Sequence, residues 1–507
     1  MILPISGAAD CVFIPHFHYI RFLFTCGEGL AKSTILEILE NAMLYSSTRG
    51  NAPARSLREL LNRGTAEDGG LYAPEAWPEL TASELSAMGE QAYDQIASDV
   101  LALFGGDDWQ QSDFSAGIRK ALAGFERSDG PPLHHLEDQL WSMELFHGPT
   151  FAFKDYALAP LAEAIDRELT ISGKRATVLC ATSGDTGAAT ANAFAGRSQA
   201  NAVILFPEGR VSDVQRRQMT CLGASNVQAI SVRGDFDDCQ SIVKSLYQSE
   251  AAKEYSYTAV NSINLARILL QTSYYIYASV KIHAECGQSV NFAVPSGNFG
   301  NIFAGYIAKQ MGAPIGKLIV TSNENDVLPR LFETGMMSKA ETIPTISPSM
   351  DIQVSSNFER MLWILKGRDG TATRDMQKQL AERSFYELSQ SEHSKLTKDF
   401  GAMKCGKGDA LDTMRQIHEQ FGKIICPHSA TGYFAADQLK ATLDGPIVVT
   451  ETAHPAKFPT AVEEALGMLP DTPARLEDLF ACEEEFVTVS PTVEAVQSVI
   501  DGKFGTP

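Results

Sequence analysis

The sequence is poor in features that mark secreted and metal-binding proteins. Its nine cysteines are scattered, and no two of them form a CxxC pair. Such spacing argues against a disulfide framework or a zinc cluster and is typical of a reducing compartment. We therefore expect a cytoplasmic protein that holds no metal.

Long apolar runs and an excess of positive charge are also missing. The richest early apolar run, from Val12 to Phe24, is broken by proline, histidine and arginine and falls short of the roughly 20 residues of a membrane helix. With 42 Lys and Arg against 62 Asp and Glu, the formal net charge is -20. Nucleic acids and anionic membranes select surfaces rich in Lys and Arg. The sequence therefore favours a small-molecule function, without nucleic-acid or membrane partners.

The length of 507 residues predicts two or three domains. Apolar residues recur every three or four positions over 80–130, so we expect a mostly helical N-terminal domain over 43–135. Over 136–507 short β-rich runs alternate with helical ones, which indicates parallel, doubly wound α/β structure. Within this region, residues 366–425 are charged and predict a helical insert.

Residues 146–163, FHGPTFAFKDYALAPLAE, place a lysine among aromatic residues. Lys154 opens an apolar-faced helix after a Gly-Pro turn, and Phe151, Phe153 and Tyr156 flank it. Loss of water favours the neutral amine, which a lysine needs in order to form a Schiff base with an aldehyde. Taken alone, such a lysine is more often an ordinary surface residue, so this interpretation needs partners.

Two further segments share a strand-loop-helix pattern rich in small residues: ATSGDTGAATANAFAG over 181–196 and FAVPSGNFGNIFAG over 292–305. Free N–H groups at a helix start can bind a carboxylate or a phosphate. For the first loop the alternative is a tight turn with Asp185 or Thr186 as the helix N-cap. For the second loop the rival is a dinucleotide-binding loop, but the spacing is not GxGxxG. A single phosphate group is the better interpretation.

A fourth segment, VVTETAHPAKFPTAVEEALG over 448–467, carries Thr450 and Thr452 where a buried strand is predicted to end. A threonine hydroxyl at this place could bond a ring nitrogen of a ligand. The alternative is an ordinary threonine at a strand end.

These four segments, in this order, resemble the threonine synthase family, in particular the longer branch found in many bacteria and in fungi. FHGPTFAFKD, SGDTG, PSGNFGN and TAHPAKF are its diagnostic motifs, and the N-terminal YSSTRG and DGGLY match it as well. The resemblance runs from Met43 to the C-terminus, whereas residues 1–42 match nothing in the family. We therefore expect Met43 to begin the functional protein and residues 1–42 to be a dispensable or non-native extension.

The resemblance implies a fold and a cofactor. The family has the type II fold of pyridoxal-phosphate enzymes, with two doubly wound α/β domains like those of the tryptophan synthase β-subunit. By this resemblance Lys154 is the Schiff-base lysine of pyridoxal 5'-phosphate, and the hydroxyl of Thr452 faces the pyridine nitrogen. The implied cofactor-phosphate loop consists of Gly297, Asn298, Phe299, Gly300 and Asn301.

The resemblance also implies a substrate site. In relatives that act on amino acids, the matching loop binds the substrate carboxylate, and here it comprises Thr182, Ser183, Gly184, Asp185 and Thr186. Asp185 stands where those relatives commonly have asparagine, which leaves its role open. The cation that binds the substrate phosphate is open too, with three candidates: Arg49, Arg360 and Lys457.

The implied reaction converts O-phospho-L-homoserine and water into L-threonine and phosphate, the last step of threonine biosynthesis. It combines γ-elimination with β-addition of water, and the freed Lys154 removes the α-proton. Two alternatives stay open: a threonine-synthase-like phospho-lyase or other type II lyase, and a non-catalytic paralogue that binds a metabolite. We expect a monomer or a homodimer.

Overall fold

The computed structural model describes residues 43–61, 63–105 and 111–505, without the side chains of 111–113. Contacts within the chain group residues 43–507 into one compact unit. The prediction that residues 1–42 are a dispensable extension lies outside the described residues. Within the described part, no helix is long and apolar enough to cross a membrane.

A six-stranded sheet forms one half of this unit, in the order β13-β10-β9-β14-β4-β3. Neighbouring strands run parallel, except for the antiparallel hairpin of β3 and β4 at one edge. Strand β14 comes late in the sequence yet lies between β9 and β4. The strands are β3 (Leu133–Glu137), β4 (Leu140–Glu144), β9 (Val290–Pro295), β10 (Ile315–Ser322), β13 (Phe400–Lys404) and β14 (Ile447–Glu451).

A five-stranded parallel sheet forms the other half, in the order β15-β7-β6-β5-β8. The apolar run of β6 is buried along nearly its whole length, as expected for a parallel strand covered on both faces. The strands are β5 (Ala176–Ala181), β6 (Ala200–Pro207), β7 (Val227–Val232), β8 (Tyr257–Thr258) and β15 (Val487–Val489).

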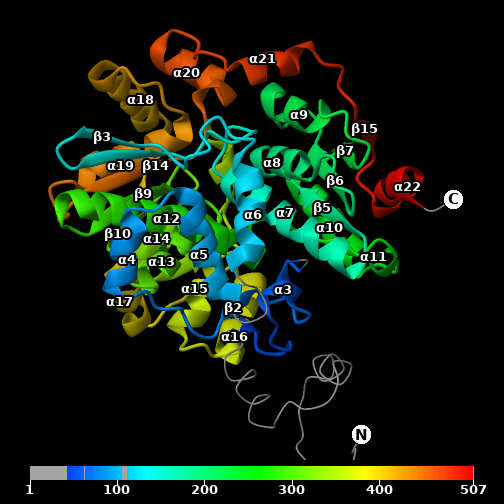
Figure 1. Cartoon of the computed structure of the whole chain (residues 1–507), viewed down its shortest axis with the longest axis horizontal. Helices are drawn as coiled ribbons and strands as arrows, with labels where there is room; N and C mark the ends of the chain where they lie inside the picture. The colour runs from blue at the N-terminus through cyan, green and yellow to red at the C-terminus, as the bar shows by residue number, and fades with distance from the viewer. Residues whose placement is uncertain (1–42, 62, 106–110, 506–507) are drawn as a thin grey trace, which may run out of the picture. The chain divides into compact units, whose positions relative to one another are not determined.

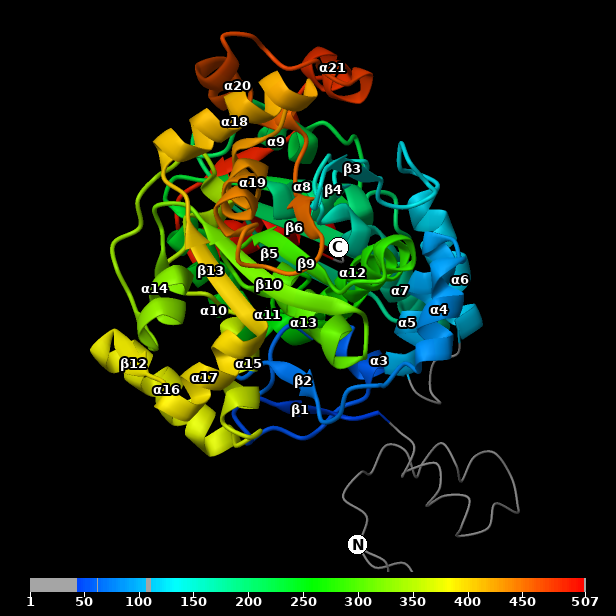
Figure 2. The same cartoon turned by 90° about the vertical axis from the view of Figure 1, so that its left-hand side faces the viewer.

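Helices cover both sheets, so the prediction of doubly wound α/β structure is confirmed. Figure 1 shows α7, α8 and α10 around β5 to β7, and Figure 2 shows α13 and α19 beside the six-stranded sheet. The helices around the five-stranded sheet are α7 (Asp155–Ser172), α8 (Asp185–Phe194), α9 (Asp213–Thr220), α10 (Phe236–Gln248), α11 (Ala251–Glu254) and α22 (Val493–Phe504). Those nearer the six-stranded sheet are α13 (Gly300–Gln310), α14 (Val327–Thr334), α15 (Phe358–Leu365), α18 (Lys407–Phe421), α19 (Pro427–Leu439) and α20 (Pro459–Leu466). Helix α21 (Ala474–Ala481) packs against α9.

Helix α12 (Leu265–Cys286) connects the two halves, because it packs against α13 on one side and α7 on the other. Most of its side chains are buried, including polar ones such as Arg267 and Gln271. Burial all round is typical of a helix in the centre of a large core. The position of α12 therefore places these polar side chains next to the region between the two sheets.

The N-terminal region is mainly helical, as predicted from the apolar spacing over 80–130. It also holds an antiparallel pair of short strands, which lies beside α15 in Figure 2. Its elements are β1 (Tyr45–Ser47), α3 (Leu57–Leu60), β2 (Tyr72–Pro74), α4 (Ala82–Gly89), α5 (Tyr93–Gly105) and α6 (Gln111–Leu122). The stretch 366–425 contains α16 (Gly370–Arg383) and α17 (Gln390–Asp399) as well as α18, but β12 (Phe385–Glu387) and β13 also belong to it, and β12 pairs with β11 (Met336–Ser338).

Arg360 joins the N-terminal region to the catalytic part. Its guanidinium is fully buried and donates to the carbonyls of Tyr72 and Ile263, each at 2.7 Å, and to the side chain of Asn357. Burial lowers the pKa of Arg360 to about 9. Arg360, a candidate for binding the substrate phosphate, is therefore a structural residue that links three segments of the chain by internal hydrogen bonds.

Cys221 and Cys482 form a disulfide that links the end of α9 to the end of α21, with Cα atoms 6.0 Å apart. The scattered cysteines of the sequence did not predict this bond, since the two residues are 261 positions apart. Five other described cysteines are unbonded, four of them buried. One link among scattered thiols falls short of a disulfide framework.

We predict that Arg360→Ala lowers the free energy of unfolding by about 3–5 kcal/mol. The reason is that three buried acceptors lose their donor, and each unpaired group costs roughly 1–3 kcal/mol. Urea denaturation measures the change. Lys378→Ala, on the exposed face of α16, serves as the control and is expected to change stability by less than about 0.5 kcal/mol. Equal unfolding midpoints for the two variants would contradict this structural role of Arg360.

Candidate active site

Lys154 lies directly before α7, in a turn that is fixed on both sides. Thr150 donates its N–H and its hydroxyl to the carboxylate of Asp155, at 2.8 and 2.6 Å. Phe153 donates its N–H to the carbonyl of Thr452 at 2.9 Å, which ties the turn to the end of β14. Phe151 adopts a left-handed backbone conformation, with φ of 58°, that only firm surroundings stabilise. The turn is therefore rigid where the lysine begins.

The predicted loss of water around Lys154 is confirmed. Its side chain is only 10% exposed, and its Nζ lies 4.5 Å from the centre of the Phe153 ring. Burial lowers the pKa of Lys154, the Asp185 carboxylate opposes this change, and the nearby charges of Arg267 and Lys457 add to it. The amine is thus easier to deprotonate than a surface lysine, as nucleophilic or basic chemistry requires.

Asp185 lies opposite this amine, at the start of α8. Its Oδ2 is 3.2 Å from the Nζ of Lys154, and its Oδ1 accepts from Lys457 at 2.7 Å and from Gln215 at 2.9 Å. Burial alone would raise the pKa of Asp185, but the charges of Lys457 and Lys154 outweigh it and hold the pKa far below its usual value. The alternative in which Asp185 caps α8 is wrong, because Gly184 occupies the N-cap position.

The rest of the 182–186 loop forms a tight bend around backbone groups. The hydroxyl of Thr182 accepts from the N–H groups of Gly184 and Gly187, at 3.0 and 2.8 Å. Gly184 has φ of 146°, and a side chain there would meet Gln215 within 2.5 Å. Ser183 is exposed and Thr186 half-buried, so only these two side chains of the loop face outward.

The loop at 297–301 leads from β9 into α13. Phe299 has a left-handed backbone, with φ of 60°, and its buried ring packs on Phe303, Phe358 and Phe400. Asn301 accepts from two tyrosine hydroxyls on α12, while its Nδ2 has no partner among the described residues. The hydroxyl of Ser296 is likewise buried without a partner there. The first turn of α13 adds N–H groups that no helical carbonyl can reach.

Two further segments complete the surroundings of Asp185. The hydroxyl of Ser349 lies 3.5 Å from Oδ2 of Asp185. The backbone N–H of Ser349 donates to the Nε2 of His428 at 3.3 Å. Thr452 is buried at the end of β14 and donates its N–H to Ser429, the residue next to His428. Burial lowers the pKa of His428 to about 3, so its ring is neutral at physiological pH. The structure thus brings the four predicted segments together.

The cations proposed for a substrate phosphate have different surroundings. Arg49 pairs with Glu359 at 2.8 Å, and Lys457 is fully buried on Asp185 and the carbonyl of Thr150. A residue that the sequence reasoning missed, Arg267 of α12, is also buried, and its Nε has no partner among the described residues. The Oδ1 of Asn261, six positions earlier, is unpartnered as well. The segment NSINLAR, with Asn and Arg beside an apolar helix, was the available signal.

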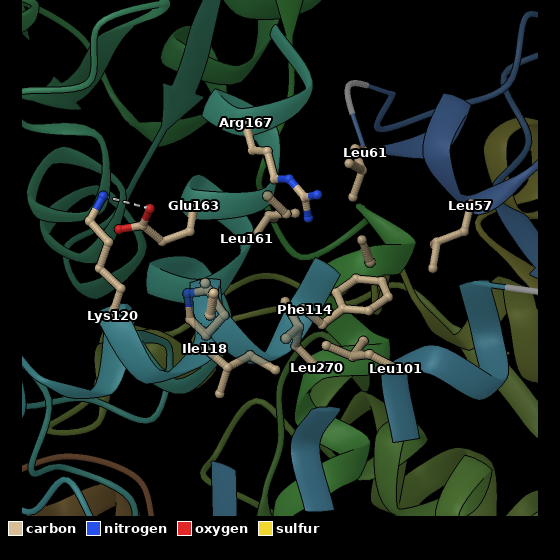
Figure 3. A pocket seen from close by; sticks show the side chains of 15 residues that line it. Leu57, Leu61, Leu101, Phe114, Ile118, Lys120, Leu161, Glu163, Arg167 and Leu270 are labelled. Atoms are coloured by element: carbon tan, nitrogen blue, oxygen red, sulfur yellow. Dashed lines mark hydrogen bonds and ion pairs between the residues drawn. The ribbon is translucent and has the colours of Figure 1, made fainter. Parts of the chain in front are cut away.

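An apolar cavity of about 420 Å³ lies between α3, α5, α6, α7 and α12. Figure 3 shows its leucine and phenylalanine lining, with the Lys120–Glu163 ion pair beside it. Its described lining includes no residue of the predicted site. The cavity is therefore separate from the predicted site.

Comparisons with known proteins agree with this geometry. The family model for pyridoxal-phosphate-dependent enzymes matches residues 129–392, and the models for the threonine synthase N-terminus and C-terminus match 44–122 and 429–500. A threonine synthase of Pseudomonas aeruginosa is 39% identical over 469 residues, covering 92% of this chain and 100% of the relative. This chain belongs to the threonine synthase family.

Solved threonine synthase structures extend the match to the fold. The PLP-bound enzyme from Brucella melitensis superposes with a TM-score of 0.87 at 42% identity, covering 91% of this chain and 99% of that one. The yeast enzyme gives 0.86 at 33% identity, with the same coverage. The type II fold, the pyridoxal-phosphate dependence and the lyase class expected from the sequence are confirmed.

The residues around 296–301 fit the phosphate of this cofactor. Two buried donors, the Ser296 hydroxyl and the Asn301 amide, have no partner among the described residues, and a helix start adds backbone N–H groups. An anion held by these groups would satisfy them. Lys154 lies within the same set of segments and carries a primary amine, the group that reacts with an aldehyde.

We predict that Gly297→Val weakens pyridoxal phosphate binding. A Cβ at this glycine would lie 2.9 Å from the side chain of Ile352 and 3.2 Å from the Cα of Met350, so residues 350–352 must move. We expect the dissociation constant to rise roughly 10- to 100-fold, the equivalent of about 1–3 kcal/mol of overpacking. Fluorescence titration of the apoprotein measures it. Gly408→Val, where a side chain meets open space, is the matched control; equal affinities would contradict the assignment.

Proposed function

We propose that the chain converts O-phospho-L-homoserine and water into L-threonine and inorganic phosphate. The observation that carries this proposal is the buried Lys154, whose amine has a lowered pKa and faces an ionised carboxylate 3.2 Å away. When bound, pyridoxal phosphate withdraws electrons from the bonds of the substrate's α-carbon. Lys154 is the residue that holds the cofactor through its aldehyde.

The remaining cofactor contacts follow from the loops around Lys154. Residues Gly297 to Asn301 hold the cofactor phosphate through their N–H groups, with Ser296 and the Asn301 amide beside them. The hydroxyl of Thr452, buried at the end of β14, would bond the pyridine nitrogen of the bound cofactor. The substrate carboxylate binds at Thr182 to Thr186, where α8 begins and its N–H groups are free of helical partners.

Lys154 also carries the proton. Its Nζ, once released, takes the proton from the substrate's α-carbon, and burial favours the neutral amine that this step needs. Asp185 then stabilises the ammonium group that forms, because its carboxylate lies within ion-pair distance. The rigid turn from Thr150 to Lys154 keeps the amine in place, which lowers the entropic cost of the transfer.

Arg267 is the cation that we assign to the substrate phosphate. It is a buried guanidinium whose Nη1 donates to the carbonyl of Val260 at 3.3 Å, while its Nε has no partner among the described residues. Its charge also lowers the pKa of Lys154. Planar guanidinium groups suit phosphate oxygens, and a dianion at this site would supply the missing counter-charge. Asn261 adds a polar side chain on the same segment. Of the earlier candidates, Arg360 and Lys457 already bond internal acceptors, and Arg49 pairs with Glu359.

We also infer the setting of this reaction. Residues 43–135 form the N-terminal domain and 136–507 the catalytic region, while residues 1–42 are dispensable for turnover. Five of the seven described cysteines are unbonded, which supports a cytoplasmic location despite the single Cys221–Cys482 disulfide. The active unit is a monomer or a homodimer.

The reaction itself is tested by measuring phosphate and threonine release from O-phospho-L-homoserine and, in parallel, from O-phospho-L-threonine. We expect threonine from the first substrate and no comparable release from the second. Lys154→Ala should lower turnover by roughly 10⁴-fold or more, because the same amine binds the cofactor and transfers the proton. Borohydride reduction of the wild type should label Lys154. Preference for O-phospho-L-threonine would instead indicate a phospho-lyase, and a label on another lysine would overturn the site.

The assignment of Arg267 predicts a separate kinetic effect. Arg267→Lys should raise the KM for O-phospho-L-homoserine by roughly 10- to 100-fold, because an ammonium group cannot replace a bidentate guanidinium. Inhibition by inorganic phosphate should weaken in parallel. Arg49→Lys, a change at the ion pair with Glu359, is the control and should leave KM unaltered. An unchanged KM in Arg267→Lys would remove this residue from the phosphate site.

A further inference from the structure

Lys457 is a buried cation that the reaction above does not use. It ends a short 3₁₀ turn, Pro455–Lys457, that follows β14, and its side chain has no exposed surface. Its Nζ lies 2.7 Å from Oδ1 of Asp185 and 2.8 Å from the carbonyl oxygen of Thr150. Both contacts are internal to the protein, so this amine has no side turned toward solvent.

Asp185 needs a permanent counter-charge. A buried carboxylate is tolerated only when it is paired and hydrogen-bonded. Its two ammonium partners are Lys154 and Lys457, whereas Gln215 adds a neutral donor and Ser349 a hydroxyl. The ammonium group of Lys154 is replaced when its Nζ joins the cofactor's aldehyde, and a free Lys154 must be a neutral amine before it can take a proton. Lys457 is the ammonium partner of Asp185 that takes no part in these steps.

We propose that Lys457 is a positioning residue that keeps Asp185 ionised while Lys154 is engaged, so that this carboxylate acts as a fixed acceptor beside the cofactor. The inference rests on the proposed role of Lys154. It also explains why an aspartate can stand where an uncharged asparagine would serve: the carboxylate and Lys457 form a pair of zero net charge. The contact with Thr150 extends the pair to the turn that carries Lys154.

A double-mutant cycle tests this pairing. Lys457→Met leaves Asp185 without its permanent partner, and Asp185→Asn leaves Lys457 as an unpaired buried charge. Each single change should raise the dissociation constant of pyridoxal phosphate by roughly 100-fold, as expected for a broken buried pair. The double variant removes both charges and should bind within about tenfold of the wild type. Losses that add up in the double variant would overturn the proposal.

A spectroscopic readout separates this role from a merely structural one. In Lys457→Met the Asp185 carboxyl loses its compensating charge, so its pKa rises and it takes up a proton as the pH falls. The absorption of the bound cofactor should then show a transition between about pH 5 and 8. The wild type should lack it, because Asp185 stays ionised there, and the double variant should lack it because the carboxyl of Asp185 is gone. A transition kept in the double variant would instead point to Asp155, whose pKa the charge of Lys457 also lowers. A transition that survives Asp185→Asn would refute the assignment.

The other charged groups around Asp185 are accounted for in this comparison. Lys154 from the turn before α7, Asp155 from the first turn of α7 and Arg267 from α12 are present in every variant. The ring of His428 from α19 is neutral over this range, since burial lowers its pKa to about 3. A matched surface pair, Asp437 and Lys440, has its charges 2.8 Å apart but is more than half exposed. The cycle of Asp437→Asn and Lys440→Met should show no coupling and no new transition.

The outcomes distinguish this inference from the proposed function. Borohydride labelling of Lys154 is recorded for each variant. Labelling of a different lysine would overturn both, whereas labelling of Lys154 with additive losses would overturn the pairing alone. Should Lys457→Met fail to fold, recovery of folded, cofactor-binding protein in the double variant supports the pair, and failure of both variants to fold refutes it.

Discussion

The carboxylate of Asp185 accepts from Lys154, which follows β4, from Lys457, which follows β14, and from Gln215 of α9. Both lysines come after strands of the six-stranded sheet, and the aspartate comes after β5 of the five-stranded sheet. Neither charge would be stable in the interior without the other. Other contacts of the site are arranged around this ionised group. They include the carbonyl of Thr150, which binds Lys457, and the hydroxyl of Ser349, which lies near Asp185.

Much of the site could be predicted from the sequence because its chemistry lies in short motifs. Lys154 beside aromatic residues, and two glycine-rich loops that each follow a strand, depend on residues a few positions apart. The repeated change between β-rich and helical runs predicted β5, β6, β7, β9, β10 and β14 and the α/β class. In such cases local preference and tertiary structure agree.

The rest depended on partners far away in the chain. The contacts of Arg360 reach Tyr72 and those of Lys457 reach Thr150, at separations of 288 and 307 residues. No local pattern shows that Arg360 links distant segments or that Lys457 neutralises a buried carboxylate. Nor does one show that Arg267 is buried without an acidic partner. The role of Asp185 stayed open for the same reason, because its partners Lys154 and Lys457 come from separate segments.

The place of β14 has a consequence for synthesis on the ribosome. This strand starts at Ile447, yet it pairs with β9 on one side and with β4, which ends at Glu144, on the other. A growing chain therefore carries two unpaired strand edges until almost all of it has been made. Such edges can pair with other chains, so the growing chain is exposed to aggregation until β14 fills the gap. A premature stop before Ile447 would leave a gap in the middle of a sheet and not merely a shorter tail.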